Sequence, residues 1–484
     1  MGSGTSTRLP GASSPRSATP SPAALPSPQA ADLAPDRVEV VSEADPVASA
    51  VNTSRLLFAS SPGAVVASIT LNPAGRKQAA TTASAAHLPL LVAPAAGSPA
   101  VDEELRRLGA TWYVAAGTVR VPPSLRAVND PPPAGPLRAA VSPAVVLAPT
   151  GGSDTPALTT ARAAGATVVP LPTGVTDPTT VPAAVTALHA DAHRPVVLLG
   201  AGFGDLPDPS WSVRSAQTGW QLPGGGQRAT TGHLSVALYG APGSPALGVL
   251  GEQDPVATVA RVRALAATYA ALTPTPVVPT LEVIATVAAG NPGADGNYSN
   301  ELPLSRLTPY LDAATDAGLP VLLDLQPGRT DFLTQAQRYT SLLERPGVGL
   351  ALDPEWRLGP EQVPLHQIGG VDVDEVNRTV TWLADLVKAK GLPPKTLVVH
   401  QFRPSMVRDR SRLDVSRPEL DVVIHVDGQG SQAAKQGTWK RMHEGAPDVA
   451  GWGWKNFLDE DSPVLTPQQT LTQVTPTPAL VSYQ

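Results

Sequence analysis

The chain has 484 residues, a net charge of −6 and charged side chains at only 16% of its positions. Its length fits two or three domains, and so sparse a charge provides no basic surface for nucleic acid. Cysteine is absent, which excludes disulfides, thiolate metal sites and a cysteine nucleophile.

The first segment, residues 1–36, is rich in Ser, Pro and Ala, and this composition predicts a disordered linker. Its start, "MGSGTSTRLP", lacks the apolar stretch of an export signal. Nowhere does the chain contain the ~20 consecutive apolar residues of a membrane span. We therefore expect no membrane span.

The second segment, residues 37–208, alternates apolar runs with Ala-rich helical stretches, which predicts a doubly wound parallel sheet. The same rhythm recurs after the proline-rich residues 129–138, which predicts an internal duplication. The predicted strands lie at 55–61, 87–94, 110–117, 144–150, 166–173 and 194–202. The predicted helices lie at 72–86, 100–110, 154–165 and 179–193.

Three stretches of this segment, "RLLFASSPGAVVAS", "LPLLVAPAAG" and "VDEELRRLGATWYVAAGTV", resemble the cell-wall-binding repeats of exported Gram-positive proteins. The resemblance covers roughly residues 50–205. It implies a protein that is extracellular or cell-wall associated and that binds cell-wall polysaccharide or another glycan. A small α/β region with another purpose is the alternative.

The third segment, residues 209–484, contains a series of apolar runs, nearly all of which end in polar residues and are followed by helical stretches. About eight such runs predict a (β/α)₈ barrel. The carboxyl ends of barrel strands meet at one open face, so we expect these polar residues to surround one pocket. The predicted strands lie at 234–240, 246–253, 279–290, 319–329, 348–356, 396–403, 420–430 and 449–457.

The run "GVGLALDPEW" places Asp353 and Glu355 at the end of a predicted strand. Pro354 cannot donate to a strand ladder, so the strand should end at Asp353. In an extended chain the two carboxylates would point the same way, about 6.6 Å apart. The pKa of one of them should then rise, as glycoside hydrolysis requires of its proton donor. We therefore predict Glu355 as the catalytic proton donor and Asp353 as its catalytic partner.

The "LALDPEW" stretch resembles the Asp-x-Glu strand end of chitinase-like and lysozyme-like barrel glycosidases. Together with "DLQPGRTDF", "HQF", "IHVDGQG" and "WGWKNF", it resembles an uncharacterised barrel of actinobacterial wall-associated proteins. That resemblance implies a glycosidase-like barrel but no known activity. Tryptophan rings could provide flat apolar faces for sugars. The predicted substrate-binding residues are Glu282, Asp324, Gln326, Arg329, Trp356, His400, Gln401, His425, Asp427, Trp452, Trp454 and Lys455.

Structural explanations exist for the same residues. Asp353 could cap the turn that follows it, while Glu355 pairs with Arg357. Arg329 could hold Asp324 in a local clamp. The histidines could be core residues with satisfied ring nitrogens, and the acid within the run 279–290 could pair with a buried lysine.

These patterns predict an exported protein whose barrel hydrolyses or binds a cell-wall or extracellular polysaccharide, with no cofactor and no metal. A non-catalytic glycan-binding scaffold is the first alternative, so enzymatic activity stays an open question. The second alternative is a metal-dependent hydrolase, because oxygen and nitrogen donors suited to Zn²⁺ or Mn²⁺ end several strands. These donors are Glu282, Asp324, His400, His425 and Asp427.

Overall fold

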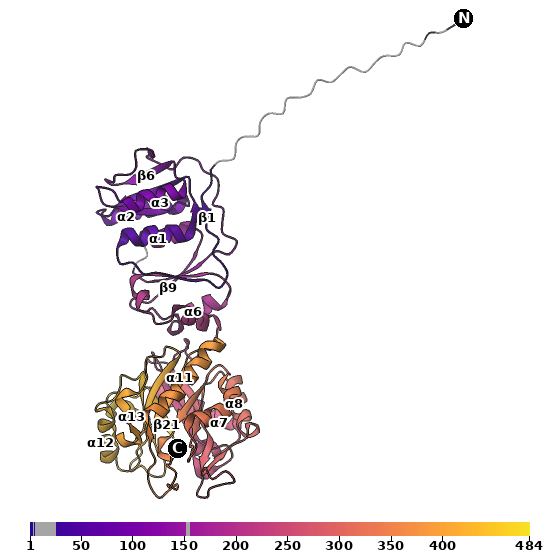
Figure 1. Cartoon of the computed structure of the whole chain (residues 1–484), viewed down its shortest axis with the longest axis vertical. Helices are drawn as coiled ribbons and strands as arrows, with labels where there is room; N and C mark the ends of the chain where they lie inside the picture. The colour runs from indigo at the N-terminus through magenta and orange to yellow at the C-terminus, as the bar shows by residue number, and fades with distance from the viewer. Residues whose placement is uncertain (3, 5–25, 152–154) are drawn as a thin grey trace.

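The computed structural model describes residues 1–2, 4, 26–151 and 155–484. They form an α/β region with two parallel sheets, followed by a closed eight-stranded parallel barrel (Figure 1). This confirms the predicted fold class. Residues 5–25 of the predicted linker lie outside the described residues. The part of it at 26–36 contains strand β1 (Gln29–Ala30), which pairs with β3 (Phe58–Ser60).

The first sheet has the order β5-β4-β6-β7, and all its pairings are parallel. Its strands are β4 (Gly63–Ser68), β5 (Leu90–Ala93), β6 (Trp112–Ala116) and β7 (Arg126–Val128). The helices beside it are α1 (Pro46–Leu57), α2 (Pro73–Ala85) and α3 (Pro99–Leu108). The prediction of a strand at 55–61 was partly wrong. Asp45 caps α1 through the Ala48 amide, and the helix continues to Leu57. The central strand is instead the next apolar run, β4.

The second sheet has the order β2-β10-β8-β9 and is also parallel throughout. Its strands are β2 (Val38–Val41), β8 (Val145–Pro149), β9 (Thr167–Leu171) and β10 (Val196–Leu199). Its helices are α4 (Pro156–Ala163), η1 (Pro178–Thr180), α5 (Pro182–His189) and η2 (Ala201–Asp205). Because β2 precedes the first sheet in the chain but pairs in the second, the two sheets interlock. Thr160 of α4 joins them, since its Oγ1 hydrogen-bonds both the N–H and the carbonyl of Leu90.

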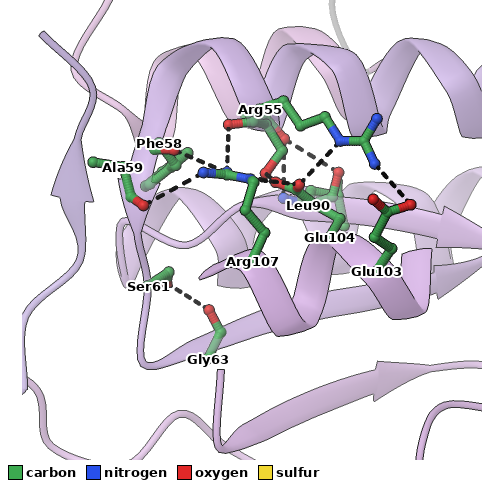
Figure 2. A network of polar contacts seen from close by, with 11 residues as sticks. Arg55, Phe58, Ala59, Ser61, Gly63, Leu90, Glu103, Glu104 and Arg107 are labelled. Atoms are coloured by element: carbon green, nitrogen blue, oxygen red, sulfur yellow. Dashed lines mark hydrogen bonds and ion pairs between the residues drawn. The ribbon is translucent and has the colours of Figure 1, made fainter. Parts of the chain in front are cut away.

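A buried carboxylate fastens α3 to α1 (Figure 2). Glu104 is fully buried, and it accepts hydrogen bonds from Nε and Nη2 of Arg107, each 2.8 Å long. Ser54 Oγ and Arg55 approach the same carboxylate from α1, and Arg107 also donates to the carbonyl of Phe58. The network also provides donors to the carbonyls of Ser54 and Phe58, where α1 ends and β3 begins. The "EELRR" part of the wall-binding-like motif thus has a structural role in this region.

The barrel has the strand order β11-β21-β20-β19-β17-β15-β14-β12 and closes by pairing β11 with β12. Its strands are β11 (Leu234–Gly240), β12 (Val277–Ala288), β14 (Val321–Leu325), β15 (Val348–Leu352), β17 (Lys395–His400), β19 (Leu420–Val426), β20 (Gly451–Asn456) and β21 (Leu480–Tyr483). The helices around it are α7 (Pro255–Ala270), α8 (Leu304–Asp316), α9 (Phe332–Arg338), α10 (Thr340–Leu343), α11 (Val373–Lys390), α12 (Gln432–His443) and α13 (Pro467–Gln473). None of the helices in the described residues is long and apolar enough to cross a membrane.

One barrel strand was predicted in the wrong place. The run at 246–253, which ends near Glu252, forms two 3₁₀ turns, η3 (Pro245–Leu247) and η4 (Val249–Glu252). Gly248 has a φ of 109°, and a Cβ on Gly251 would lie 2.3 Å from the carbonyl oxygen of Ala241, so this glycine-rich run folds back on the end of β11. The eighth strand is β21, a run of four residues that the sequence analysis missed.

The N-terminal region is attached at the amino end of the barrel (Figure 1). Helix α6 (Pro209–Gln217) contributes Trp211 to the barrel core and Val213 to the core of the second sheet. In the segment that follows, Arg228 donates to Asp177 at 2.6 Å and to Asp421 at 2.7 Å, so it bridges η1 of the N-terminal region and β19 of the barrel. The predicted boundary at 208/209 therefore cuts a continuous interface.

Replacing Arg228 with Met should lower the free energy of unfolding by about 3–5 kcal/mol, because it leaves the buried Asp421 carboxylate without its cation. Urea unfolding followed by circular dichroism measures the loss. Arg412→Met is the matched control, since Arg412 and its partner Asp374 are both exposed and the midpoint should stay unchanged. Equal midpoints for the two variants would contradict the structural role of Arg228.

Candidate active site

The barrel interior has a polar layer directly above an apolar layer. An interior cluster contains small and branched apolar side chains: Ala237, Leu322, Ala351, Val398, Val423 and Leu480. Side chains two positions apart on a strand point the same way. Two residues further along each of these strands, toward the carboxyl end, lie Tyr239, Asp324, Asp353, His400, His425 and Ser482. Strand periodicity thus brings six polar groups from distant parts of the chain to one level.

A cavity of about 780 Å³ opens above this layer at the carboxyl ends of the strands. Six predicted site residues line it: Gln326, Asp353, Glu355, Trp356, Asp427 and Lys455. Its other lining residues include both apolar and basic side chains: Ile284, Val287, Leu365, Ile368, Phe402, Phe457, Arg403 and Arg441. Leu365 is 82% exposed and has a φ of 66°, so its apolar side chain is held at the rim.

The two acids of "LDPEW" both reach the cavity, but the predicted extended geometry was wrong. After β15 the chain forms a 3₁₀ turn, η5 (Pro354–Trp356), and Asp353 caps it by accepting from the Glu355 amide at 3.2 Å. Gly369 N–H donates to the Glu355 carbonyl at 2.7 Å, and a Cβ on Gly369 would lie 2.4 Å from that oxygen. The Asp353 side chain and the Gly369 backbone therefore both hold this turn in place. Arg357 pairs with Glu375, not with Glu355.

His400 lies between two carboxylates below the cavity floor. Its Nε2 is 2.8 Å from Glu282 Oε1, and its Nδ1 is 3.1 Å from Asp427 Oδ2. All three side chains are almost completely buried. Burial disfavours a charged ring, but the charge of Glu282 and the hydrogen bonds to both carboxylates raise the pKa of His400 well above its usual range. The ring is therefore an imidazolium that donates in both directions.

The imidazolium separates the pKa values of the cavity carboxylates. Burial alone would raise the pKa of Asp427, but the hydrogen bond and charge of His400 lower it below its usual value. Burial, and then the charge of Asp427, raise the pKa of Glu355 to about 7. Burial also raises the pKa of Asp353 well above its usual range. Near neutral pH the cavity thus holds an ionised Asp427 beside a protonated Asp353 and a Glu355 that is protonated in about half of the molecules.

Tyr239 connects two other polar residues of the barrel by hydrogen bonds, and the sequence analysis did not predict it. Its hydroxyl donates to Asp324 Oδ2 at 2.9 Å and accepts from Gln326 Nε2 at 3.1 Å. Burial raises the pKa of Asp324 to about 6. Asp324 has no contact with Arg329, so the predicted clamp does not form. Tyr239 ends the predicted strand 234–240, and the strand-end rule that selected the other residues would have found it.

His425 stacks on His400 with ring centroids 5.0 Å apart. Burial and the charge of His400 lower the pKa of His425 well below its usual range, so the ring is neutral. Its Nε2 is 2.8 Å from Ser482 Oγ, a partner on the missed strand β21. A Cβ on Gly453 would lie 2.8 Å from the His425 ring, so glycine at 453 makes room for this ring.

Eight predicted substrate-binding residues do not line the cavity. Four of them, Glu282, Asp324, His400 and His425, are buried in the polar layer beneath it, and the other four lie elsewhere. Successive side chains of β20 point to opposite faces, so Trp452 and Trp454 point outward while Lys455 points inward. Both tryptophan rings pack on Trp439 of α12. Arg329 donates to the carbonyl of Gln362 at 3.0 and 3.1 Å. The fourth is Gln401, which is buried and whose side-chain amide has no hydrogen-bond partner among the described residues.

Glu282, Asp324 and His400 offer ligand atoms within 4.8 Å of one another, close enough for a metal ion. A histidine ligates a metal through an unprotonated nitrogen. In this arrangement both nitrogens of His400 face carboxylates at hydrogen-bonding distance. The geometry is that of a buried ion pair, but the Asp427 partner of Nδ1 would equally suit a histidine that binds a metal through Nε2, so the metal-dependent alternative stays a prediction.

Comparison with known proteins adds little to this geometry. No family model matches the chain, and no curated protein matches it. A solved structure, Cwp6 from Clostridium difficile, aligns with a TM-score of 0.26 and 12% identity over 53% of this chain. The alignment spans 64% of that protein's length. Similarity at this level bears on neither fold nor function.

Replacing Tyr239 with Phe should lower the free energy of unfolding by about 1–3 kcal/mol, because it leaves the buried atoms Asp324 Oδ2 and Gln326 Nε2 without a hydrogen-bond partner. Urea unfolding measures the change. Tyr113→Phe is the control, since the half-buried Tyr113 makes no hydroxyl hydrogen bond within the described residues and should unfold like wild type. Wild-type stability in Tyr239→Phe would show that the hydroxyl contributes nothing to the layer.

Proposed function

We propose that the barrel is a glycoside hydrolase that acts on a cell-wall or extracellular polysaccharide, with Glu355 as proton donor and Asp427 as the ionised carboxylate. One observation carries the proposal. A single cavity at the carboxyl ends of the strands contains two carboxyl groups whose pKa values are driven apart by their surroundings. Glycoside hydrolysis needs this division between an acid and a base or nucleophile.

Asp427 suits the second role better than the predicted partner, Asp353. The Asp353 carboxyl caps its own turn, and burial favours its protonated form. Asp427 has one oxygen held by His400, while its other oxygen, Oδ1, has no hydrogen-bond partner among the described residues. The held oxygen fixes the orientation of the carboxylate. The other is unpaired but buried, so the sugar or an attacking water would reach it only after a shift of the side chains that cover it.

In this scheme Glu355 gives its proton to the glycosidic oxygen as the bond to the anomeric carbon breaks. Asp427 stabilises the positive charge that develops on the sugar, or removes a proton from water, and His400 keeps it ionised. A cavity of about 780 Å³ is within the range of ligand pockets and has room for a short oligosaccharide. Its apolar side chains, Trp356 and Ile368 among them, suit the apolar faces of sugar rings.

The proposed location, outside the cell and on the wall, rests on the sequence resemblance of residues 50–205. The arrangement of the chain is consistent with it. The N-terminal region is joined to the amino end of the barrel, and the cavity opens at the opposite, carboxyl end. A glycan bound by the N-terminal region would therefore leave the cavity unobstructed.

Glu355→Gln should abolish release of reducing ends from purified actinobacterial cell walls, because the amide has no proton to donate. Glu361→Gln is the matched control. Glu361 is exposed in the loop after η5, does not line the cavity, and should release at the wild-type rate. Equal release by wild type and Glu355→Gln would reject the assignment. Retention of wild type on the walls without any release would support the non-catalytic scaffold.

The rate should depend on pH through the same two groups. Glu355 must be protonated, so kcat/KM should fall as pH rises through about 7, which is well above the pKa of an ordinary glutamate. Asp427 must be ionised, and because its pKa is lowered, activity should persist below the pH at which an ordinary aspartate becomes protonated. The charged and titratable groups that face Glu355 are Asp353, His400, Arg403, Asp427 and Lys455.

Arg403 lowers the pKa of Glu355 by its charge, so Arg403→Gln should move the alkaline limb to higher pH. A pH profile of reducing-end release measures both effects. An alkaline limb near pH 4.5 in the wild-type protein would mean that Glu355 is not the donor.

A further inference from the structure

Three cations line the cavity, yet none is used by the catalytic scheme. Lys455 ends β20, Arg403 follows β17, and Arg441 lies on α12. Within the described residues, none of the three side chains makes an ion pair or donates a hydrogen bond to an oxygen. Arg403 and Lys455 instead make cation–π contacts with aromatic rings. Arg403 and Arg441 are exposed, whereas Lys455 is 97% buried, with 3% of its surface exposed.

Lys435 shows what a buried lysine in this barrel ordinarily has. Its Nζ donates to the carbonyls of Gly428 and Lys455 and pairs with Asp461, each at 2.8 Å. Lys455 is equally buried, but its Nζ lies 3.5 Å from the centroid of the Tyr239 ring and has no oxygen acceptor among the described residues. Burying an ammonium without an acceptor is unfavourable. Lys455 is thus a largely buried cation at the cavity lining, and its Nζ has no hydrogen-bond acceptor among the described residues.

The three cations converge on one wall. A Cβ on Gly428 would lie 3.4 Å from Phe402 Cβ and 3.4 Å from Thr438 Cγ2, so Gly428 lies between the residue before Arg403 and α12. Arg441 is three residues after Thr438 and therefore lies on that same helical face. Lys455 and Arg403 both act by charge on Glu355. The cationic wall, defined as Lys455, Arg403 and Arg441, is therefore adjacent to the proposed proton donor.

The ionised acids of the cavity do not account for all of these cations. His400 shares its one positive charge between Glu282 and Asp427, and the charge of Lys455 also lowers the pKa of Asp427. The two arginines make no ion pair with an acid of the described residues, and they leave the wall with an excess of positive charge. Guanidinium forks match the planar or tetrahedral oxygens of carboxylate and phosphate groups.

We propose that the cationic wall binds an acidic group on the glycan, a carboxylate or a phosphate, and so makes the barrel specific for acidic cell-wall glycans. This inference rests on the proposed function, because it names the substrate class of the same cavity. Lys455 would contact the acidic group at the floor and the two arginines would contact it at the rim. A neutral glycan would offer hydroxyl oxygens to the ammonium but no opposing charge.

Binding, not turnover, tests the inference. The full chain carrying Glu355→Gln is titrated calorimetrically with soluble fragments of sonicated cell walls in four forms: native, carboxyl-reduced, stripped of phosphate by hydrofluoric acid, and treated both ways. Each titration is repeated with Arg403→Gln and Arg441→Gln added together. Lys440→Gln is the matched control, because this exposed neighbour of Arg441 on α12 does not line the cavity.

We expect the double arginine substitution to weaken binding of native fragments at least tenfold, and Lys440→Gln to leave it unchanged. The loss should disappear on whichever treated form lacks the recognised group, which tells carboxylate from phosphate. Any contribution of the N-terminal region cancels, since it is the same in all variants. Both arginines are exposed, so the melting temperature should be that of the parent protein.

Equal binding of native fragments with and without the arginine substitutions would overturn the inference. So would a loss that persists on doubly treated fragments, because the arginines would then act on something other than an acidic group. These outcomes are separate from those of the cleavage assay. Wall cleavage by wild type, together with unchanged binding in the double variant, rejects the acidic substrate alone. The expected binding without any cleavage rejects hydrolysis alone.

Discussion

The site depends on one buried interaction, the imidazolium of His400 held between Glu282 and Asp427 inside a closed barrel. An isolated charge at this depth would be strongly unfavourable, so each member is tolerated only because the others are present. Strand pairing places His400 and His425 in register, and β12 brings Glu282 from more than a hundred residues earlier in the chain. The sheet geometry thus creates the charge pattern, and the charge pattern determines which acid is ionised.

The remaining polar groups divide the barrel into levels with different tasks. The apolar cluster fills the interior, the Tyr239–Asp324–Gln326 hydrogen bonds support the floor, and Glu355 and Lys455 face the cavity. The amino end is occupied by the connection to the N-terminal sheets through Arg228. Binding to a polymer and chemistry on it would therefore occur at opposite ends of the barrel without competing for surface.

Much of this architecture could be read from apolar runs, because strands buried on both faces of a sheet need continuous hydrophobic sequence. The same rule failed where a run had another reason to be apolar. Residues 246–253 pack as 3₁₀ turns against β11, and Trp452 and Trp454 cover the outside of the barrel beneath α12. An apolar residue in the sequence indicates burial, but it does not indicate on which side of the sheet the residue is buried. Strand β21 has only four residues, too few for its apolar residues to form a recognisable run.

The sequence by itself determined the α/β class, the barrel, and the concentration of polar side chains at strand ends, since these follow from local periodicity and from where a proline or glycine ends a strand. It also placed Asp353 and Glu355 together. Only the tertiary structure decided that Asp427 is the ionised carboxylate, that Tyr239 and Ser482 complete the polar layer, and that three cations share one wall. Those properties depend on distance and burial among residues far apart in the chain, and no local pattern encodes either quantity.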